Sequence, residues 1–178
     1  MDLTAFVRDV PDFPKPGVLF KDITPLLADP KAFGYTIARM AAHYAKAPIG
    51  AIAAVEARGF LFAAPLALEL NLPLVPLRKP GKLPYQTHSF RYDLEYGSAE
   101  LHMHIDGVAA GSRVLLVDDV LATGGTAAAT LGLIEQAGGT VTGFSVLLEL
   151  EFLGARAKLA PRARNGQRHR PPAGAVSR

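Results

Sequence analysis

The chain has 178 residues and no cysteine, which suits one domain with a substantial core and excludes disulfides and thiolate metal sites. Five of its 19 Lys and Arg lie in residues 160–178, so the other 14 face 16 Asp and Glu and the remaining chain is slightly acidic. No basic face, apolar run of roughly 18 residues or signal peptide is visible; we expect a cytoplasmic protein with no nucleic-acid partner and no membrane association.

The N-terminal third begins with an irregular segment and continues into alternating helices and strands. Residues 1–30 are rich in proline and aromatic residues, which precludes a continuous helix. Asp29-Pro30 is typical of a helix start and predicts a helix over residues 31–45. A short buried strand is expected over residues 49–55, followed by a turn at 56–59 and a helix over 60–70.

The middle of the chain contains a long polar segment between two strands. Residues 72–77 are predicted to form a strand, and residues 78 to about 97 become polar. Such a long connection is usually a functional lid or an extended ribbon. Residues 96–105 alternate loosely and are predicted to form the returning strand.

The most informative segment covers residues 114–126. Four apolar residues lead into Asp118 and Asp119 and then into a glycine- and threonine-rich loop, and residues up to 137 favour a helix. The apolar run is typical of a strand buried on both faces of a parallel sheet. With another strand over 140–148, the alternation predicts an α/β fold with a doubly wound, mainly parallel sheet flanked by helices.

The loop after this strand has the chemistry of an anion site. Free N–H groups and the helix macrodipole attract a phosphate at such a helix start, while Thr123 and Thr126 offer hydroxyl donors. Asp118 and Asp119 would repel a phosphate but accept hydrogen bonds from sugar hydroxyls. The segment therefore predicts a ribose 5-phosphate pocket formed by Asp118, Asp119, Ala122, Thr123, Gly124, Gly125 and Thr126.

This segment resembles the thirteen-residue signature of the type I phosphoribosyltransferases, which bind 5-phosphoribosyl 1-pyrophosphate (PRPP). Four further segments resemble the adenine phosphoribosyltransferase family in order and spacing over residues 6–159: 13–27, 56–60, 77–84 and 92–97. The resemblance implies one domain over residues 1–159, with a hood at about 1–30 and a flexible lid at about 78–97. It also implies a homodimer.

The implied reaction converts adenine and PRPP to AMP and pyrophosphate in purine salvage. Negative charge accumulates on the departing pyrophosphate and requires preorganised cations. By resemblance, Arg58, Arg78, Lys79 and Lys82 bind this group, and Arg58 is also catalytic. Mg²⁺ is implied through substrate oxygens and water, without a direct protein site.

The resemblance also assigns the adenine contacts and a proton acceptor. Phe20 is expected to stack on the purine, with Leu19 and Lys21 offering main-chain contacts. Glu95 is the candidate that accepts a purine proton when the lid closes, next to Tyr96. No side chain specifies adenine, so a transferase for another purine base and a PRPP-binding regulator without catalysis remain alternatives.

Two segments depart from the family pattern. The lid contains Tyr85-Gln86 after Pro84 where the family has a small residue, so roles within residues 85–91 do not transfer from it. Residues 160–178 are basic and lack the apolar content of a core, which predicts a disordered tail or a shifted reading frame.

Overall fold

The computed structural model describes residues 1–93, 98–159 and 176–177. Its main sheet has the strand order β4-β3-β7-β8-β9, and every neighbouring pair is parallel. The strands are β4 (Leu74–Leu77), β3 (Ala51–Val55), β7 (Arg113–Leu121), β8 (Thr140–Glu149) and β9 (Val176–Ser177). The predicted parallel α/β sheet is thus confirmed.

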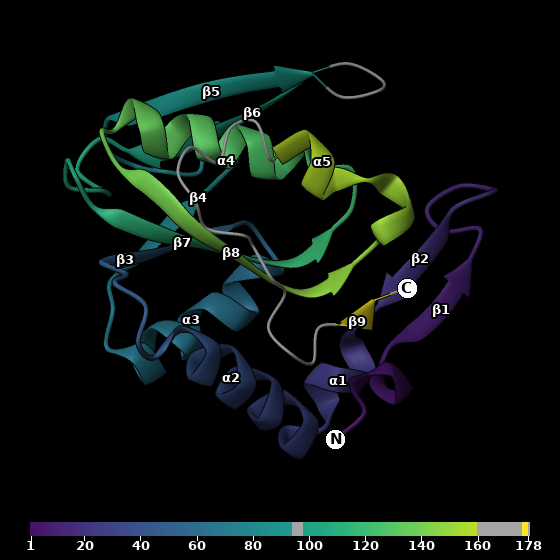
Figure 1. Cartoon of the computed structure of the whole chain (residues 1–178). Coiled ribbons are helices and arrows are strands. Elements are labelled where there is room, and N and C mark those ends of the chain that lie inside the picture. The colour runs from purple at the N-terminus through teal and green to yellow at the C-terminus, as the bar shows by residue number, and fades with distance from the viewer. Residues whose placement is uncertain (94–97, 160–175, 178) are drawn as a thin grey trace.

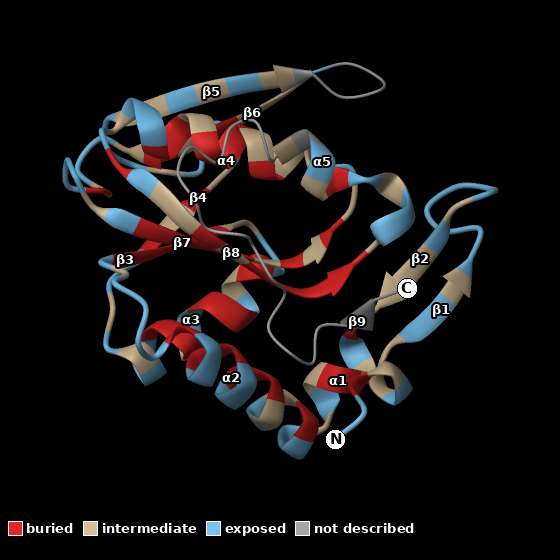
Figure 2. Ribbon diagram, in the orientation of Figure 1, coloured by how far each residue is buried: buried red, intermediate tan, exposed pale blue. Residues whose placement is uncertain are grey.

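Helices cover both faces of this sheet (Figure 1). On one face lie α2 (Pro30–Tyr44) and α3 (Gly59–Leu70), and α4 (Gly125–Gln136) lies on the other. The buried surfaces of β3, β7 and the helices face one another on both sides (Figure 2), in two apolar clusters. Strands buried on both faces read as nearly continuous apolar runs, which is why residues 114–117 were recognisable in the sequence.

Two antiparallel ribbons stand outside the main sheet. The first joins β1 (Arg8–Pro11) to β2 (Leu19–Asp22), after the short helix η1 (Leu3–Phe6) and before α1 (Thr24–Ala28). This first ribbon belongs to the N-terminal segment, residues 1–30, for which we keep the name hood. The second joins β5 (Thr87–Asp93) to β6 (Ser98–His104) and runs along α4 (Figure 1).

The second ribbon occupies much of the predicted lid. Residues 87–93 pair in regular register with 98–104, so this part of the lid is the extended ribbon that was one of the two expectations. The connecting residues 94–97 lie outside the described residues.

Strand β7 differs from its predicted extent. It continues through Asp118 and Asp119 to Leu121 and pairs with β8 along this length. The acidic pair, which follows the apolar run of residues 114–117, therefore belongs to the strand itself. The two carboxylates sit within the ladder, and their side chains alternate between the two faces of the sheet.

The chain after β8 returns across the end of the sheet. The short helix η2 (Glu151–Leu153) leads into α5 (Ala155–Leu159). Val176 and Ser177 pair with Leu148 and Glu149 as β9. Residues 160–175 and 178 lie outside the described part. Across the described residues, none of the helices has the length and apolar character needed to cross a membrane.

Candidate active site

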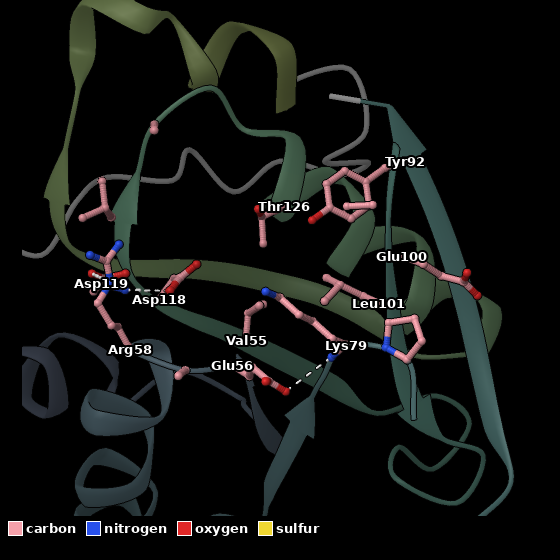
Figure 3. Close-up of a pocket in the computed structure, with 15 residues that line it drawn as sticks. Val55, Glu56, Arg58, Lys79, Tyr92, Glu100, Leu101, Asp118, Asp119 and Thr126 are labelled. Carbon is pink, nitrogen blue, oxygen red and sulfur yellow. Dashed lines mark hydrogen bonds and ion pairs between the residues drawn. The ribbon is translucent and has the colours of Figure 1, made fainter. Parts of the chain in front are cut away.

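A cavity of about 510 Å³ opens at the carboxyl ends of β3 and β7. This edge of a parallel sheet is where ligands bind in open α/β folds. Its lining comes from the ends of both strands, from the start of α4 and from the β5–β6 ribbon (Figure 3). The lining residues are Val55, Glu56, Ala57, Arg58, Lys79, Pro80, Tyr92, Ala99, Glu100, Leu101, Asp118, Asp119, Val120, Ala122 and Thr126.

A smaller hollow of about 70 Å³ adjoins this cavity at the start of α4. The loop residues Thr123, Gly124 and Gly125 line it, and Asp118, Ala122 and Thr126 border both spaces. Gly124 has φ +84°, a left-handed conformation that favours glycine, and it directly precedes the first helical residue. The seven residues predicted for the ribose-phosphate pocket therefore lie together, around the positive end of the helix macrodipole.

Asp118 and Asp119 occupy different environments. The backbone N–H of Asp119 donates to Asp118 Oδ1 at 2.9 Å. Burial, followed by the neighbouring Asp119 charge, raises the pKa of Asp118 to about 7. Asp119 is only 3% exposed, and its Oδ2 lies 2.7 Å from Arg58 Nε. This contact lacks the angles of a hydrogen bond, so Oδ2 has no hydrogen-bond partner among the described residues.

Arg58 connects this cavity to the hood. It lies at the turn that precedes α3, and its guanidinium carbon is 5.3 Å from the centre of the Phe20 ring, a cation–π contact. The next residue, Gly59, lets the helix approach β7 closely. A Cβ at that position would lie 3.1 Å from Asp118 Oδ1 and 3.1 Å from the Val117 carbonyl oxygen.

Glu56 lines the cavity and had no predicted role. Its Oε2 accepts a hydrogen bond from Arg78 Nε at 2.8 Å and one from the Lys79 backbone N–H at 3.4 Å. Burial raises the pKa of Glu56, but the bonds from Arg78 and Lys79 and the charges of Arg78 and Lys82 outweigh burial and lower it. Glu56 thus holds the start of the basic segment against the end of β3.

The four predicted pyrophosphate residues are only partly brought together. Arg58 and Lys79 line the cavity, and the Lys79 side chain extends into it (Figure 3). Arg78 is turned toward Glu56 and also donates to the Lys82 carbonyl oxygen at 3.1 Å. Arg78 and Lys82 are not lining residues in this conformation.

The predicted adenine residues lie on the hood strand β2. Phe20 reaches the cavity through its contact with Arg58 and packs edge to face on Phe13 at 5.1 Å. Lys21 Nζ is bound to Asp9 Oδ1 at 2.6 Å, and Leu19 is 52% exposed. These three residues do not line the cavity, so an additional hood movement would be needed for them to enclose a ligand there.

Two of the ribbon residues that line the cavity, Tyr92 and Glu100, are polar and had no predicted role. Tyr92 points into the cavity toward Thr126 (Figure 3). Glu100 borders the cavity, while its Oε1 lies 3.0 Å from His102 Nε2. Tyr92 precedes the candidate Glu95 by three residues, a proximity that could have indicated it. Glu95 and Tyr96 lie outside the described residues.

The donor set does not form a dedicated metal cage. The described residues contain no group of three or more His, Cys, Asp or Glu side chains arranged to hold a metal. Two neighbouring carboxylates that line the cavity suit Mg²⁺ that is carried mainly by phosphate oxygens and water.

Comparison with known proteins identifies the family. The phosphoribosyl transferase domain model matches residues 27–164. The adenine phosphoribosyltransferase of Maridesulfovibrio salexigens is 57% identical over 160 residues, covering 90% of this chain and 94% of that protein.

Solved structures give the same result. The enzyme from Thermoanaerobacter pseudethanolicus superimposes with a TM-score of 0.88 at 49% identity, covering 95% of each chain. The Saccharomyces cerevisiae enzyme, solved with adenine and an imino-altritol bisphosphate, gives 0.85 at 38% identity, covering 88% of this chain and 92% of that one. The chain therefore belongs to the adenine phosphoribosyltransferase family.

Proposed function

We propose that the 510 Å³ cavity is the site where this chain joins adenine to the phosphoribosyl group of PRPP. As an adenine phosphoribosyltransferase, the chain converts adenine and PRPP to AMP and pyrophosphate in purine salvage. The observation that carries the site assignment is the meeting of an acidic pair, a phosphate-type loop and two cations in one cavity.

The loop and the acidic pair bind the ribose 5-phosphate half of the substrate. The phosphate accepts hydrogen bonds from backbone N–H groups and from Thr123 and Thr126 at the start of α4. Asp118 and Asp119 accept hydrogen bonds from the ribose hydroxyls. The Asp119 oxygen that lacks a hydrogen-bond partner is suited to such a donor.

Arg58 and Lys79 bind the pyrophosphate and stabilise the charge that it gains as the anomeric bond breaks. Arg58 must exchange its contact with Asp119 for one with the pyrophosphate, which also frees Asp119 for the ribose. Arg78 and Lys82 join this group when the lid closes, since Arg78 now pairs with Glu56.

The hood supplies the contacts to adenine, and the lid supplies the proton acceptor. Phe20 stacks on adenine, and Leu19 and Lys21 present main-chain groups to its edge. Glu95 accepts the purine proton as the new glycosidic bond forms, so that the base attacks as a neutral nucleophile. Asp118 and Asp119 would hold Mg²⁺ through water, and the ion would supply positive charge to the pyrophosphate of PRPP.

A homodimer and a cytoplasmic location complete the proposal. The outer face of α3 supports the dimer, because Leu61 and Leu68, two turns apart, are 44% and 84% exposed. Cell fractionation tests the location.

The assignment is tested by supplying the purified protein with PRPP, Mg²⁺ and one purine at a time. We expect AMP from adenine and no nucleotide from hypoxanthine, guanine or xanthine. Formation of IMP or GMP would show that the substrate is another purine base. PRPP binding without any nucleotide product would leave only a binding function.

Glu95→Gln should lower kcat by about a hundredfold, in the range of lost acid–base catalysis, with little change in the PRPP dissociation constant.

A further inference from the structure

Gly132 lies in the interior of α4, where glycine weakens a helix relative to alanine. A Cβ at this position would overlap the Phe90 ring, whose Cδ2 and Cζ atoms would be 2.6 and 2.7 Å away. The aromatic ring of β5 therefore lies directly on the helix backbone. We call this contact the Phe90–Gly132 notch.

A second helix offers a direct comparison. Gly34 lies in the interior of α2, and a Cβ there would meet nothing within 4 Å. Alanine fits at position 34 without a new contact but cannot fit at position 132 unless Phe90 moves. Of these two helix positions, only Gly132 is required to be glycine by its packing.

The notch fixes a second aromatic residue on the same face of the ribbon. Phe90 and Tyr92 are two residues apart on β5, so their side chains point in the same direction. Both pack against the apolar cluster that contains Ala129 and Leu133 of α4. The Tyr92 ring reaches Gly125, two helical turns before Gly132, where a Cβ would lie 3.8 Å from Tyr92 Cδ2.

Tyr92 thereby closes one side of the cavity beside the phosphate-type loop. Its side chain is directed toward Thr126, and both residues line the cavity (Figure 3). A tyrosine here covers the loop with an apolar ring and offers a hydroxyl donor to a phosphate or ribose oxygen.

We propose that Tyr92 is a ligand-binding residue of the ribose-phosphate site and that the Phe90–Gly132 notch positions it there. The inference rests on the proposed function, because it takes the cavity to bind a nucleoside phosphate. It assigns a role inside residues 85–91, where the lid departs from the family pattern. Gly132 and Phe90 touch no ligand and act only through Tyr92.

The test measures AMP and inorganic pyrophosphate binding separately by isothermal titration calorimetry. AMP carries the ribose 5-phosphate but no pyrophosphate, so it reports on Tyr92. Gly132→Ala and Tyr92→Ala should each weaken AMP binding by about tenfold, the loss expected for one displaced hydrogen-bonding ring. Pyrophosphate binding should stay within about twofold of the wild-type value, since Arg58 and Lys79 are not on the ribbon.

Two variants separate the notch from general effects of substitution. Gly34→Ala makes the same chemical change in a helix interior and should leave AMP binding unchanged. Phe90→Val, added to Gly132→Ala, makes room for the new methyl group and keeps an apolar anchor, so it should restore most of the lost AMP affinity. Thermal unfolding of each variant checks that the fold is intact.

The outcomes also distinguish this inference from the proposed function. If wild-type protein binds AMP and Thr126→Ala weakens it, while Tyr92→Ala and Gly132→Ala bind AMP as the wild type does, the inference is wrong and the site assignment stands. An equal loss of AMP and pyrophosphate binding in Gly132→Ala, without rescue by Phe90→Val, would also overturn it. Failure of the wild-type protein to bind AMP would refute the site assignment itself.

Discussion

At the scale of single residues, the site is controlled by how two adjacent carboxylates are buried. Asp118 and Asp119 alternate across β7, and only Asp119 contacts Arg58. Burial leaves Asp118 with a pKa of about 7, against an ordinary value of 3.8. The carboxylate that we propose as an acceptor for ribose hydroxyl groups therefore titrates near neutrality.

The raised pKa of Asp118 predicts two pH effects. Below its folded pKa of about 7 and above 3.8, the folded protein holds a proton that the unfolded chain releases. The free energy of unfolding should therefore fall as pH rises through this window, and PRPP affinity should rise as Asp118 ionises. Urea unfolding and PRPP titrations between about pH 4 and pH 8 measure both.

Asp118→Asn is the matched variant for this prediction. It should remove this contribution to the slope of unfolding free energy against pH and flatten the rise in PRPP affinity. Wild-type and variant profiles that run parallel would contradict the assigned pKa.

Gly59 gives a second prediction at this scale. A Cβ there would lie 3.1 Å from Asp118 Oδ1, so Gly59→Ala should push the carboxylate or the start of α3 aside. We expect kcat/KM for PRPP to fall by about tenfold or more, because small displacements of positioned groups are costly. Steady-state kinetics measure this change. Gly34→Ala, which meets no neighbour, should retain full activity, and equal losses in both would reject the explanation.

At the scale of elements, an ion pair between Arg156 and the buried Glu149 helps to hold α5 beside the phosphate-type loop. Arg156 Nε lies 2.6 and 2.7 Å from the two carboxylate oxygens of Glu149, which is 4% exposed. This bidentate pair anchors the helix to the end of β8. Ala155, the neighbour of Arg156, packs on Gly124, where an added Cβ would lie 3.3 Å from the Ala155 Cβ.

Removing Arg156 should therefore cost both stability and loop geometry. Arg156→Ala leaves the Glu149 carboxylate buried without this partner and should lower the free energy of unfolding by about 3 kcal/mol. In a Glu149→Gln background the same change should cost clearly less, since a neutral amide needs no counter-charge. Chemical denaturation of the four proteins gives this double-mutant cycle, and equal costs in both backgrounds would contradict it.

At the scale of the whole molecule, a five-stranded parallel sheet gathers the ends of β3 and β7 at one edge, and two antiparallel ribbons form separate sheets. The hood reaches this edge through Phe20 and Arg58, and the β5–β6 ribbon reaches it through Tyr92. The cavity thus lies between segments that are far apart in the chain, which suits a reaction that joins two substrates.

The exposed face of α3 carries the prediction for assembly. We expect the wild-type protein to elute from gel filtration as a dimer, because Leu61 and Leu68 would otherwise remain in water. Leu68→Glu, which puts a charge on this face, should shift the protein to the monomer, whereas Lys46→Glu on another exposed segment should not. A monomeric wild-type protein would refute the homodimer.

The sequence by itself determined the parallel α/β class, the helix predicted over residues 31–45 and found over 30–44, and the glycine-rich loop at the start of α4. These features depend on local periodicity, on strands buried on both faces and on glycines required at a helix start. Each of these signals comes from residues that are close together in the sequence. Through resemblance to a family, the sequence also indicated Arg58 and Lys79 as site residues, and both line the cavity.

Only the tertiary structure decided how far β7 extends, which cations face the cavity and which residues complete it. Glu56 holds Arg78 away from the lining, and Tyr92 enters it because Phe90 lies over Gly132. These arrangements depend on contacts between residues 22 to 42 positions apart in the chain. Burial, charge pairing and the space left by a missing Cβ determine which of these residues come into contact. No local sequence pattern predicts these contacts, because their free energy arises only when the elements pack together.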